Sequence, residues 1–369
     1  MVSNIFDDVR AVCSTNIEDL LSMAVEQGAS DLHLTVPYPP SLRINGVIVP
    51  IEEAPELTPD DVKRVFEFIT TEAQREKFYE RLELDFMYHL PDAARFRVNA
   101  CLQQGSISIS FRVIPLYIPT LEELGLPEVC KTLAMKHHGL VLVTGPTGVG
   151  KTTTMACMIN QMNQSSARKI ITIEDPVEYV HGRAKSMIVQ RDLGNDTRSF
   201  HDALKHALRQ DPDVILVGEM RDLETMSTAI SAAETGHLVI STLHTIGAGD
   251  TIERIIDAFP AHQQQQIRLQ LSLVLEGVLS QILLPRADGV GRIAAFEIML
   301  GTFAIRNLIR ESKTHQINTV LELGSNGGMH SLGQDIKRLA KEGKITVNEE
   351  LAQIYGLPEE VINVVGKNK

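Results

Sequence analysis

The segment that most restricts how this chain can fold is GPTGVGKT, at residues 145–152. It matches the phosphate-binding pattern G-x-x-x-x-G-K-[ST] in full, and it stands between an apolar run, GLVLVT, and a segment that we expect to be helical. Glycines allow the backbone amides of such a loop to turn toward phosphate oxygens, and the N-terminus of the next helix adds a partial positive charge. The alternative is a glycine-rich turn that binds nothing, and the complete pattern in this context argues against it.

We expect the phosphates of ATP to contact one continuous set of residues: Gly145, Pro146, Thr147, Gly148, Val149, Gly150, Lys151, Thr152 and Thr153. Lys151 should reach the β- and γ-phosphates, and the Thr152 hydroxyl should bind Mg²⁺. The sequence therefore predicts ATP and Mg²⁺ as the ligands of this site.

Strand and helix signals alternate through the central part of the chain. Short apolar runs, KIITIEDP, DVILVGE and HLVISTLHT, alternate with segments that we expect to be helical at 199–210 and 222–234. Such runs predict a parallel sheet covered on both faces. Beyond Phe259 we expect a mostly helical region, about 260–369, in which 269–284 is a buried helix because polar residues interrupt it too often for a membrane span.

The first part of the chain follows another pattern. A helical stripe at 17–25 precedes strand-like alternation, with Asn45-Gly46 as a hairpin signal and with helix starts at Thr58 and Thr71. We therefore expect a small α+β domain with an antiparallel sheet at 1–114. Prolines at positions 115, 119 and 127 predict a linker at 115–127, and the ATPase domain would occupy 128–369.

A carboxylate ends the run DVILVGE. Glu219 should lie at the C-terminal edge of its strand, where open α/β sheets bind ligands. Gly218 stands where many P-loop enzymes carry an aspartate, so we expect Glu219 to act on Mg²⁺ through water. The alternative is that Glu219 caps the helix that starts near Asp222.

A second acidic segment, IEDPVEYVH, brings Glu174, Asp175 and Glu178 together after another strand. Three acids beside a phosphate site are unfavourable unless they hold a metal, accept a proton or pair with arginines. Glu178 could orient and deprotonate the attacking water. Without a P-loop in the chain, a solvated acidic loop would be an equal alternative.

Two histidines flank the strand in TGHLVISTLHT. Their spacing disfavours a shared metal ion, because His237 and His244 would lie more than about 20 Å apart along an extended strand, at about 3.3 Å per residue. His244, at the C-terminal end, could sense the γ-phosphate. His237, at the other end, could equally be a structural histidine.

Charge and composition restrict the function classes. The net charge of −12 and the pI near 5.5, with no Trp and 5% aromatic residues, disfavour a nucleic-acid channel. The chain contains no window of about 20 apolar residues, and its first ten residues carry acids where a signal peptide carries bases. Four scattered cysteines indicate a reducing compartment. We expect a cytoplasmic protein without a transmembrane segment.

The motifs, in the order P-loop, acidic segment, VGE and histidine segment, resemble those of the secretion-type hexameric ATPases that drive type II secretion and type IV pili. GASDLHL, near Asp31, and RFRVN, near Arg97, are similar to the PAS-like N-terminal domain of that family. The resemblance covers almost the whole chain. It implies an α/β fold, a RecA-like P-loop ATPase core with a small PAS-like α+β domain before it and a helical C-terminal region after it.

The resemblance also implies roles for single residues. Glu178 would be the general base and Glu219 the Walker B acid, which holds Mg²⁺ through water. His237 and His244 would be the histidine-box residues. The family usually has Ser at the position of Val149, and we expect little consequence because that side chain should point away from phosphate.

Two arginines of the N-terminal domain receive a role from the resemblance alone. Arg97 and Arg112 align with arginines that family members move onto a phosphate at a subunit boundary. Such an arginine supplies about 10³ to 10⁵ in rate. From the sequence alone, a pair of exposed strand residues is the simpler alternative.

The segments AIRNLIRE, at 304–311, and GMHSLGQDIKRLAKEGKIT, at 328–346, resemble the pilus retraction branch of the family. On a helix, Ile305, Leu308 and Ile309 form an apolar stripe, whereas Arg306 and Arg310 form a cationic ridge. The resemblance implies that AIRNLIRE is needed for retraction beyond hydrolysis. We expect replacement of both arginines to stop retraction while leaving folding and basal hydrolysis largely intact.

The function that the resemblance implies is an Mg-dependent ATPase motor that powers pilus retraction, the depolymerisation of pilin behind twitching motility. Its partners would be further copies of itself in a homohexamer, an inner-membrane platform protein and the pilus base, with a second retraction ATPase as a further candidate. The motor would be cytoplasmic and peripheral to the inner membrane. The alternatives are an accessory retraction ATPase, a pilus-assembly or type II secretion ATPase and, more distantly, a nucleic-acid translocase or a nucleotide-gated scaffold.

Overall fold

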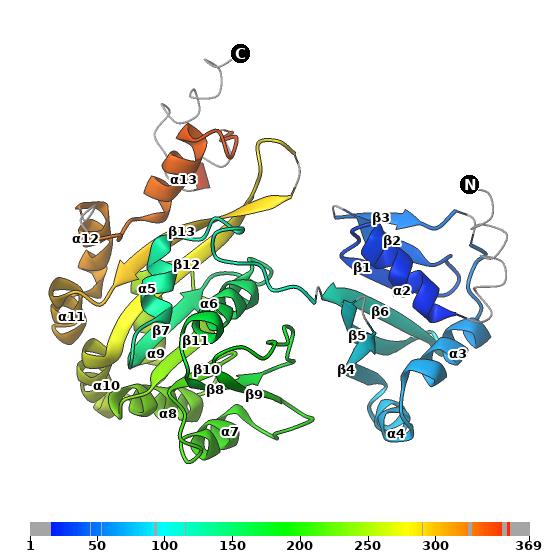
Figure 1. Ribbon diagram of the computed structural model, residues 1–369, viewed down its shortest axis with the longest axis horizontal. Coiled ribbons are helices and arrows are strands. Elements are labelled where there is room, and N and C mark those ends of the chain that lie inside the picture. Colours follow the sequence, from blue (N-terminus) through cyan, green and yellow to red (C-terminus); the bar gives the residue numbers. More distant parts are fainter. Residues whose placement is uncertain are drawn as a thin grey trace. The chain divides into compact units, whose positions relative to one another are not determined.

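The computed structural model describes residues 16–44, 46–52, 54–91, 94–114, 116–289, 291–323, 327–348 and 353–354. The chain divides into two compact units, Met1–Tyr117 and Ile118–Lys369 (Figure 1). In the described ranges no helix is both long enough and apolar enough to cross a membrane.

The first unit is built on an antiparallel sheet with the strand order β3-β2-β1-β6-β5-β4. Its strands are β1 (Asp31–Leu34), β2 (Ser41–Ile44), β3 (Val47–Pro50), β4 (Glu83–Leu90), β5 (Ala94–Gln103) and β6 (Ser106–Ile114). The register Ile44 opposite Val47 confirms the predicted hairpin, and Gly46 takes the positive φ of 85° that its turn requires. Asn45 lies outside the described residues.

The helices of the first unit start where the sequence predicts. They are α2 (Ile17–Glu26), α3 (Pro59–Ile69) and α4 (Glu72–Arg81). Thr58 and Thr71 each form a capping box, in which the threonine side chain accepts a hydrogen bond from the third helical residue and that residue's side chain accepts one from the threonine N–H. Phe66 of α3 and Phe78 of α4 are fully buried and reach the same core as the sheet.

The second unit is built on a mainly parallel sheet with the order β13-β12-β7-β11-β10-β8-β9. Its strands are β7 (Gly139–Thr144), β8 (Lys169–Glu174), β9 (Met187–Asp192), β10 (Val214–Val217), β11 (Leu238–Leu243), β12 (Leu275–Pro285) and β13 (Arg292–Leu300). Only the pair β12 and β13 is antiparallel among these described strands.

Helices cover both faces of this sheet (Figure 1). They are α5 (Glu128–Ala134), α6 (Lys151–Ser165), α7 (Phe200–Ala207), α8 (Leu223–Glu234), α9 (Ala248–Asp257), α10 (Ala261–Val274), α11 (Phe303–Arg310), the 3₁₀ turn η1 (Thr314–Gln316), α12 (Ile317–Leu323) and α13 (Leu332–Lys341). Along β7, Val141 and Val143 join the core under α5 and α6, whereas Leu140 and Leu142 join the core under α7 to α12. This alternation explains why the strands are apolar throughout.

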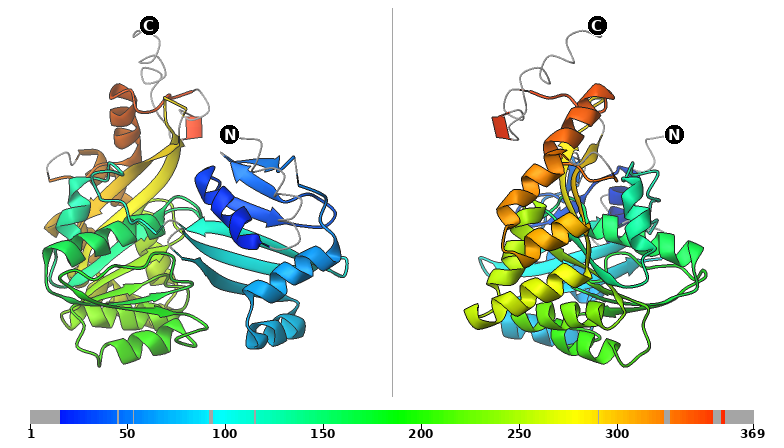
Figure 2. Two further views of the ribbon diagram at one scale, coloured as in Figure 1. Left: turned by 45° about the vertical axis from the view of Figure 1, so that its right-hand side comes forward. Right: turned by 90° about the vertical axis from the view of Figure 1, so that its left-hand side faces the viewer.

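The region beyond Phe259, which we expect to be mostly helical, also contains two strands, and the expected buried helix at 269–284 is wrong. Helix α10 ends at Val274, and the rest of the expected helix 269–284 is strand β12, which forms a long hairpin with β13. The run LEGVLSQILLP is apolar on both sides because Leu279 faces one core and Val278 the other, so periodicity cannot distinguish this strand from a buried helix. The far part of the hairpin is covered by α13 (Figure 2).

The expected linker 115–127 overlaps the division between the two units. Ile118 and Leu121 are buried in the core that α5 and α6 share, and the carbonyl of Pro119 accepts a hydrogen bond from Cys157 Sγ of α6 at 2.9 Å. Ile118 and the residues that follow it therefore belong to the second unit, and the change between units falls after Tyr117.

Helix α11, which carries the AIRNLIRE segment, packs against α10 through the predicted apolar stripe. Ile305 and Ile309 are fully buried and Leu308 partly so. The Arg310 side chain stays on the exposed side and donates to Asn307 Oδ1 of the same helix. These positions agree with an amphipathic packing helix.

Arg306 is not part of an exposed ridge, so this half of the expectation is wrong. Its guanidinium binds the C-terminal end of α10, where helical carbonyls have no partner within the helix. It donates to Gly301 O at 2.6 Å, to Ser272 O at 3.0 Å and to Leu273 O, and it pairs with Glu276 at 2.8 Å. Arg306 therefore joins α11 to α10 and to β12.

Candidate active site

Four parallel strands end together at one edge of the second sheet. Leu243 of β11 lies opposite Thr144 of β7, and Val217 of β10 lies between Ser241 of β11 and Ile173 of β8. The P-loop, His244, Glu219 and the acidic segment each follow one of these strands. The topology therefore brings them to the edge at which such sheets bind ligands.

The P-loop turns at its glycines. Gly145, Gly148 and Gly150 have φ values of 137°, 79° and 89°, which side chains other than glycine's rarely allow. A Cβ atom on Gly148 would meet open space, whereas one on Gly145 would lie 2.2 Å from the Gln281 carbonyl oxygen. The Val149 side chain is buried, so it does not face solvent. The loop thus has free space beside Gly148, whereas Gly145 packs closely against the backbone of β12.

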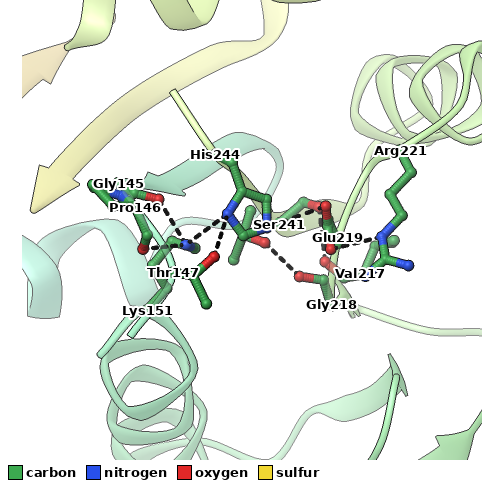
Figure 3. Close-up of polar contacts among 11 residues, drawn as sticks. Gly145, Pro146, Thr147, Lys151, Val217, Gly218, Glu219, Arg221, Ser241 and His244 are labelled. Atoms are coloured by element: carbon green, nitrogen blue, oxygen red, sulfur yellow. Dashed lines mark hydrogen bonds and ion pairs between the residues drawn. The ribbon is translucent and has the colours of Figure 1, made fainter. Parts of the chain in front are cut away.

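Lys151, His244 and Glu219 form a connected chain of polar contacts (Figure 3). The Lys151 amine donates to Gly145 O at 2.7 Å and to Pro146 O at 2.9 Å, and it lies 3.4 Å from His244 Nδ1. On the other side of the ring, His244 Nε2 lies 3.2 Å from Glu219 Oε1. Lys151 is therefore linked through one imidazole to the carboxylate of Glu219.

The donors and acceptors of this chain fix the state of the imidazole. A charged lysine amine can only donate, so Nδ1 of His244 accepts and Nε2 carries the proton that points to Glu219. Burial lowers the pKa of the Lys151 amine, and the charge of Glu219 opposes this shift.

Gly218 has a steric reason for being glycine. A Cβ atom there would lie 3.2 Å from Ile173 O and 3.3 Å from the Cα atom of Glu174, closer than most side chains come to their neighbours. Thr242 Oγ1 also donates to the Gly218 carbonyl at 2.6 Å. An aspartate is therefore disfavoured at this position, and Glu219 is the acid that the strand presents.

Glu219 does not cap the helix that follows it. Helix α8 is capped by Asp222, whose side chain accepts from the Thr225 N–H at 2.7 Å. The second oxygen of Glu219 instead pairs with Arg221 Nε at 2.8 Å. Both carboxylate oxygens thus have partners among the described residues.

The acidic segment is fixed by strand β9 and reaches α6. Gln190 Nε2 donates to Tyr179 O at 2.8 Å and to Glu174 Oε1 at 3.3 Å, and Gln190 Oε1 accepts from the His181 N–H at 3.0 Å. The Tyr179 hydroxyl lies 3.2 Å from Thr153 Oγ1. Glu178, half-buried, immediately precedes Tyr179.

Glu174 is an unusual carboxyl group. It is 9% exposed, accepts from Thr172 Oγ1 at 2.6 Å, and has the charge of Glu178 nearby. Burial raises its pKa to about 7, although the hydrogen bonds from Thr172 and Gln190 oppose the shift. The Glu174 carboxyl group is therefore partly protonated at neutral pH, and Glu178 lies in the same acidic segment.

His237 lies at the opposite end of β11 from the P-loop. The Gly139 N–H, at the start of β7, donates to the His237 carbonyl at 3.1 Å, and the His237 ring contacts Ala232 O at 3.0 Å and Thr235 Oγ1 at 3.3 Å. The structure does not bring this residue to Lys151, and its ring has the contacts of a structural histidine at the end of α8.

Arg97 and Arg112 belong to the first unit. They lie directly opposite each other on β5 and β6. Arg112 Nε donates to Asp31 Oδ1 at 3.0 Å, and its side chain is 66% exposed. The two arginines form a positively charged cross-strand pair, and the side chain of Arg112 is exposed to solvent. Their action on a phosphate stays a prediction.

The donor groups fit the ligands that the sequence predicts. The Thr152 hydroxyl is half-exposed at the start of α6, and the carboxylate of Glu219 faces the same edge of the sheet. Oxygen donors of this kind suit Mg²⁺, which usually keeps several waters and a nucleotide phosphate among its ligands.

Three residues near the site were missed by sequence reasoning. Arg221 stands two positions after Glu219, and a cation so close to the strand-end acid was a usable signal. Gln190 and Gln281 gave no such signal, because an isolated glutamine in a strand forms no recognised pattern. Only the topology places them beside the acidic segment and the P-loop.

Comparison with known proteins gives the family. The sequence profile of the family described as type II/IV secretion system protein matches residues 8–351. This chain belongs to that family. The fold class predicted from the sequence, a RecA-like ATPase core with a small PAS-like N-terminal domain, is confirmed, apart from the strands β12 and β13 in its C-terminal region.

Several relatives in this family are named as pilus proteins. The type IV pilus retraction ATPase PilT of Pseudomonas aeruginosa is 47% identical over 344 residues, which are 93% of this chain and 99% of PilT. The twitching motility protein of Neisseria gonorrhoeae is 47% identical over 306 residues, 83% of this chain and 82% of that protein. A crystal structure of the pilus retraction motor PilT with bound ADP matches with a TM-score of 0.86 and 46% identity, over 94% of this chain and 98% of that one.

Proposed function

We propose that this chain is the motor subunit of type IV pilus retraction, an ATPase that works as a homohexameric ring at the cytoplasmic side of the inner membrane. Its energy source would be ATP with Mg²⁺, and its mechanical partners would be an inner-membrane platform protein and the base of the pilus. A second retraction ATPase is a further partner in this proposal.

The chemistry follows from the groups at the sheet edge. P-loop amides and Lys151 hold the β- and γ-phosphates, and Glu178 orients and deprotonates the attacking water. When bound, Mg²⁺ would be held by Thr152 and, through water, by Glu219, and would offset phosphate charge. The imidazole of His244 would report the presence of a γ-phosphate to Glu219.

Arg97 and Arg112 would complete the site from a neighbouring subunit. A guanidinium placed on the γ-phosphate stabilises charge that develops during transfer. Hydrolysis would then depend on how the two units of adjacent subunits meet, so the nucleotide state and the shape of the ring would be coupled. Coupling of this kind could deliver mechanical work to the pilus base.

One observation carries the proposal most directly. The connected groups Lys151, His244 and Glu219 lie at the P-loop of a chain that aligns with 99% of a protein named as a pilus retraction ATPase. Near-complete coverage of that relative favours the whole motor over an isolated nucleotide-binding domain. The acidic composition supports the choice against a nucleic-acid translocase.

Genetic complementation tests this function. A host strain that lacks this chain is expected to display surface pili but no twitching motility, and the native chain should restore motility. Lys151→Gln should not restore it, because the amide cannot supply the positive charge that the phosphates need. Pilus number, by electron microscopy, and colony spreading are the measurements.

The outcome also separates the alternatives within the family. Loss of all surface pili in the deletion strain would contradict retraction and would favour an assembly motor. Phosphate release by the purified native chain, with and without Mg²⁺, tests the enzyme itself. Absence of release at saturating ATP and Mg²⁺ would contradict the motor and favour a nucleotide-gated scaffold.

A further inference from the structure

Strand β12 lies beside the P-loop strand and continues past it. Ser280 of β12 is opposite Thr144, the last residue of β7, so the next residue, Gln281, is level with the start of the P-loop. The Gln281 side chain is buried, at 1% exposure. A buried amide must find partners for both its donor and its acceptor.

Gln281 finds both partners around Lys151. Its Nε2 atom donates to the Val149 carbonyl at 2.7 Å, and its Oε1 atom accepts from Thr154 Oγ1 at 2.9 Å. One partner precedes Lys151 in the loop and the other follows it in the first turn of α6. The Gln281 backbone carbonyl also packs closely against Gly145, since a Cβ atom on Gly145 would lie 2.2 Å from its oxygen. A single residue thus supports the start, the end and the following turn of the loop.

The bond to Val149 has a direct consequence for the next amide. In a trans peptide the C=O and N–H groups point in opposite directions, so the Val149 carbonyl and the Gly150 N–H share one plane with opposite orientation. Because Gln281 holds the carbonyl toward β12, the Gly150 N–H points away from β12. That N–H is one of the donors with which a P-loop binds phosphate.

We propose that Gln281 is a positioning residue for nucleotide binding: by holding the Val149 carbonyl, it keeps the Gly150 N–H turned toward the phosphates. Without this bond the peptide between Val149 and Gly150 is free to rotate, since Gly150 tolerates many backbone conformations. The loop would then lose pre-organisation, and nucleotide affinity would fall before the chemical step is affected. The inference rests on the nucleotide site proposed above and is independent of pilus retraction.

Binding of ADP is the experiment. Gln281→Met has a similar volume and removes both hydrogen bonds, and Gln281→Asn keeps an amide but shortens its reach. We expect both to weaken ADP binding, measured by calorimetry with Mg²⁺ present, by about tenfold. The KM for ATP should rise by a similar factor, while kcat should change by less than about threefold. The reason is that an ordered P-loop contributes mainly to nucleotide binding and less to the chemical step once the nucleotide is bound.

Thr154→Val is the matched control. It removes the hydroxyl that donates to Gln281 Oε1 but leaves the hydrogen bond from Gln281 to Val149. It therefore tests whether the loss of any hydrogen bond of Gln281 weakens ADP binding. We expect it to lower the melting temperature about as much as Gln281→Met while ADP affinity stays within about twofold.

Three results would contradict either the role of Gln281 or the nucleotide site itself, and the measurements distinguish them. If Gln281→Met and Gln281→Asn bind ADP as the native chain does, Gln281 does not position the loop. If Thr154→Val loses as much affinity as Gln281→Met, in step with melting temperature, the role of Gln281 is structural only. If the native chain itself fails to bind ADP, the nucleotide site proposed above is wrong, whatever Gln281 does.

Discussion

At the scale of single residues, Glu174 connects burial with chemistry. Its carboxyl group ends β8 inside the protein, and burial raises its pKa from 4.5 to about 7. Between these two values the folded chain binds a proton that the unfolded chain releases. The folded state is therefore stabilised at pH values below 4.5 and loses that stabilisation as the pH rises through 7.

We predict that Glu174→Gln makes the nucleotide-free chain more stable than the native chain at pH 8, but not at pH 5. The glutamine keeps an acceptor for Thr172 and Gln190 and never becomes charged. A change from 4.5 to about 7 corresponds to about 3 kcal/mol, at about 1.4 kcal/mol per pH unit. The difference in melting temperature, followed by circular dichroism from pH 5 to pH 8, measures the effect.

Glu322→Gln controls for the loss of one carboxylate, since Glu322 is exposed on α12. It should leave the melting temperature close to that of the native chain throughout the pH range. A constant difference between Glu174→Gln and the native chain from pH 5 to pH 8 would show that ionisation of Glu174 does not control stability.

Residue-level prediction from the sequence succeeded where a local pattern carries the chemistry. Lys151 belongs to a complete motif, and His244 ends a strand, so the sequence predicts the position of each within the fold. Gln281 is separated from Lys151 by 130 positions in the sequence. Its role depends on which strand lies next to β7, and no local pattern contains that information.

At the scale of elements, two arginines of α11 have different roles where this helix packs against α10, although the sequence pattern places both on one cationic ridge. Arg306 holds the carbonyls that end α10, whereas Arg310 contacts only the side chain of Asn307 among the described hydrogen bonds. Loss of Arg306 leaves the partly buried carbonyls of Ser272 and Gly301 without this partner. Loss of Arg310 leaves no such group.

We predict that Arg306→Ala lowers the free energy of unfolding by about 2 kcal/mol, in the range for hydrogen bonds to charged groups. Arg310→Ala should change it by less than about 0.5 kcal/mol, as is usual for exposed positions. Urea unfolding of the nucleotide-free chain measures both, and each variant serves as the control for the other.

This pair also decides how a retraction defect should be interpreted. If Arg310→Ala unfolds like the native chain and still stops retraction, the AIRNLIRE helix acts on a partner through its exposed side. Equal destabilisation by Arg306→Ala and Arg310→Ala would contradict the division of roles. The double replacement is uninformative because it mixes a packing defect with a surface change.

Element prediction failed at β12 for a physical reason. A strand that is buried on both faces has no alternation of apolar and polar residues, and its length of 11 residues also suits a helix. The correct assignment depends on pairing with β7 and β13, which are distant in sequence. By contrast, α3 and α4 were predicted to begin at their threonine caps because the signal is local.

At the scale of the whole molecule, the question is whether one chain holds a complete active site. The second unit contains the P-loop, His244 and Glu219, whereas Arg97 and Arg112 belong to the first unit. Arg112 is bound by Asp31, so its removal would also disturb the first unit. The Arg97 side chain makes no hydrogen bond or ion pair with the described residues, which makes it the better probe.

We predict that Arg97→Ala leaves ring assembly intact and lowers kcat by about 10³-fold, the lower end for an arginine that stabilises transferred phosphate. Arg64→Ala, on the exposed surface of α3 in the same unit, is the control and should keep the native rate. Light scattering and phosphate release, measured on the same samples over a range of protein concentrations, give assembly and activity together.

Mixed rings test directly whether the arginine acts across a subunit boundary. Arg97→Ala and Lys151→Ala should each be inactive alone. When the two are co-expressed, about a quarter of the boundaries in a randomly mixed ring pair an intact Lys151 with an intact Arg97 from the neighbour. Activity should therefore return to a measurable fraction of the native rate. If both residues act within one chain, no boundary is complete and mixing restores nothing, so the ring-shared site would be wrong even if each single variant behaves as predicted.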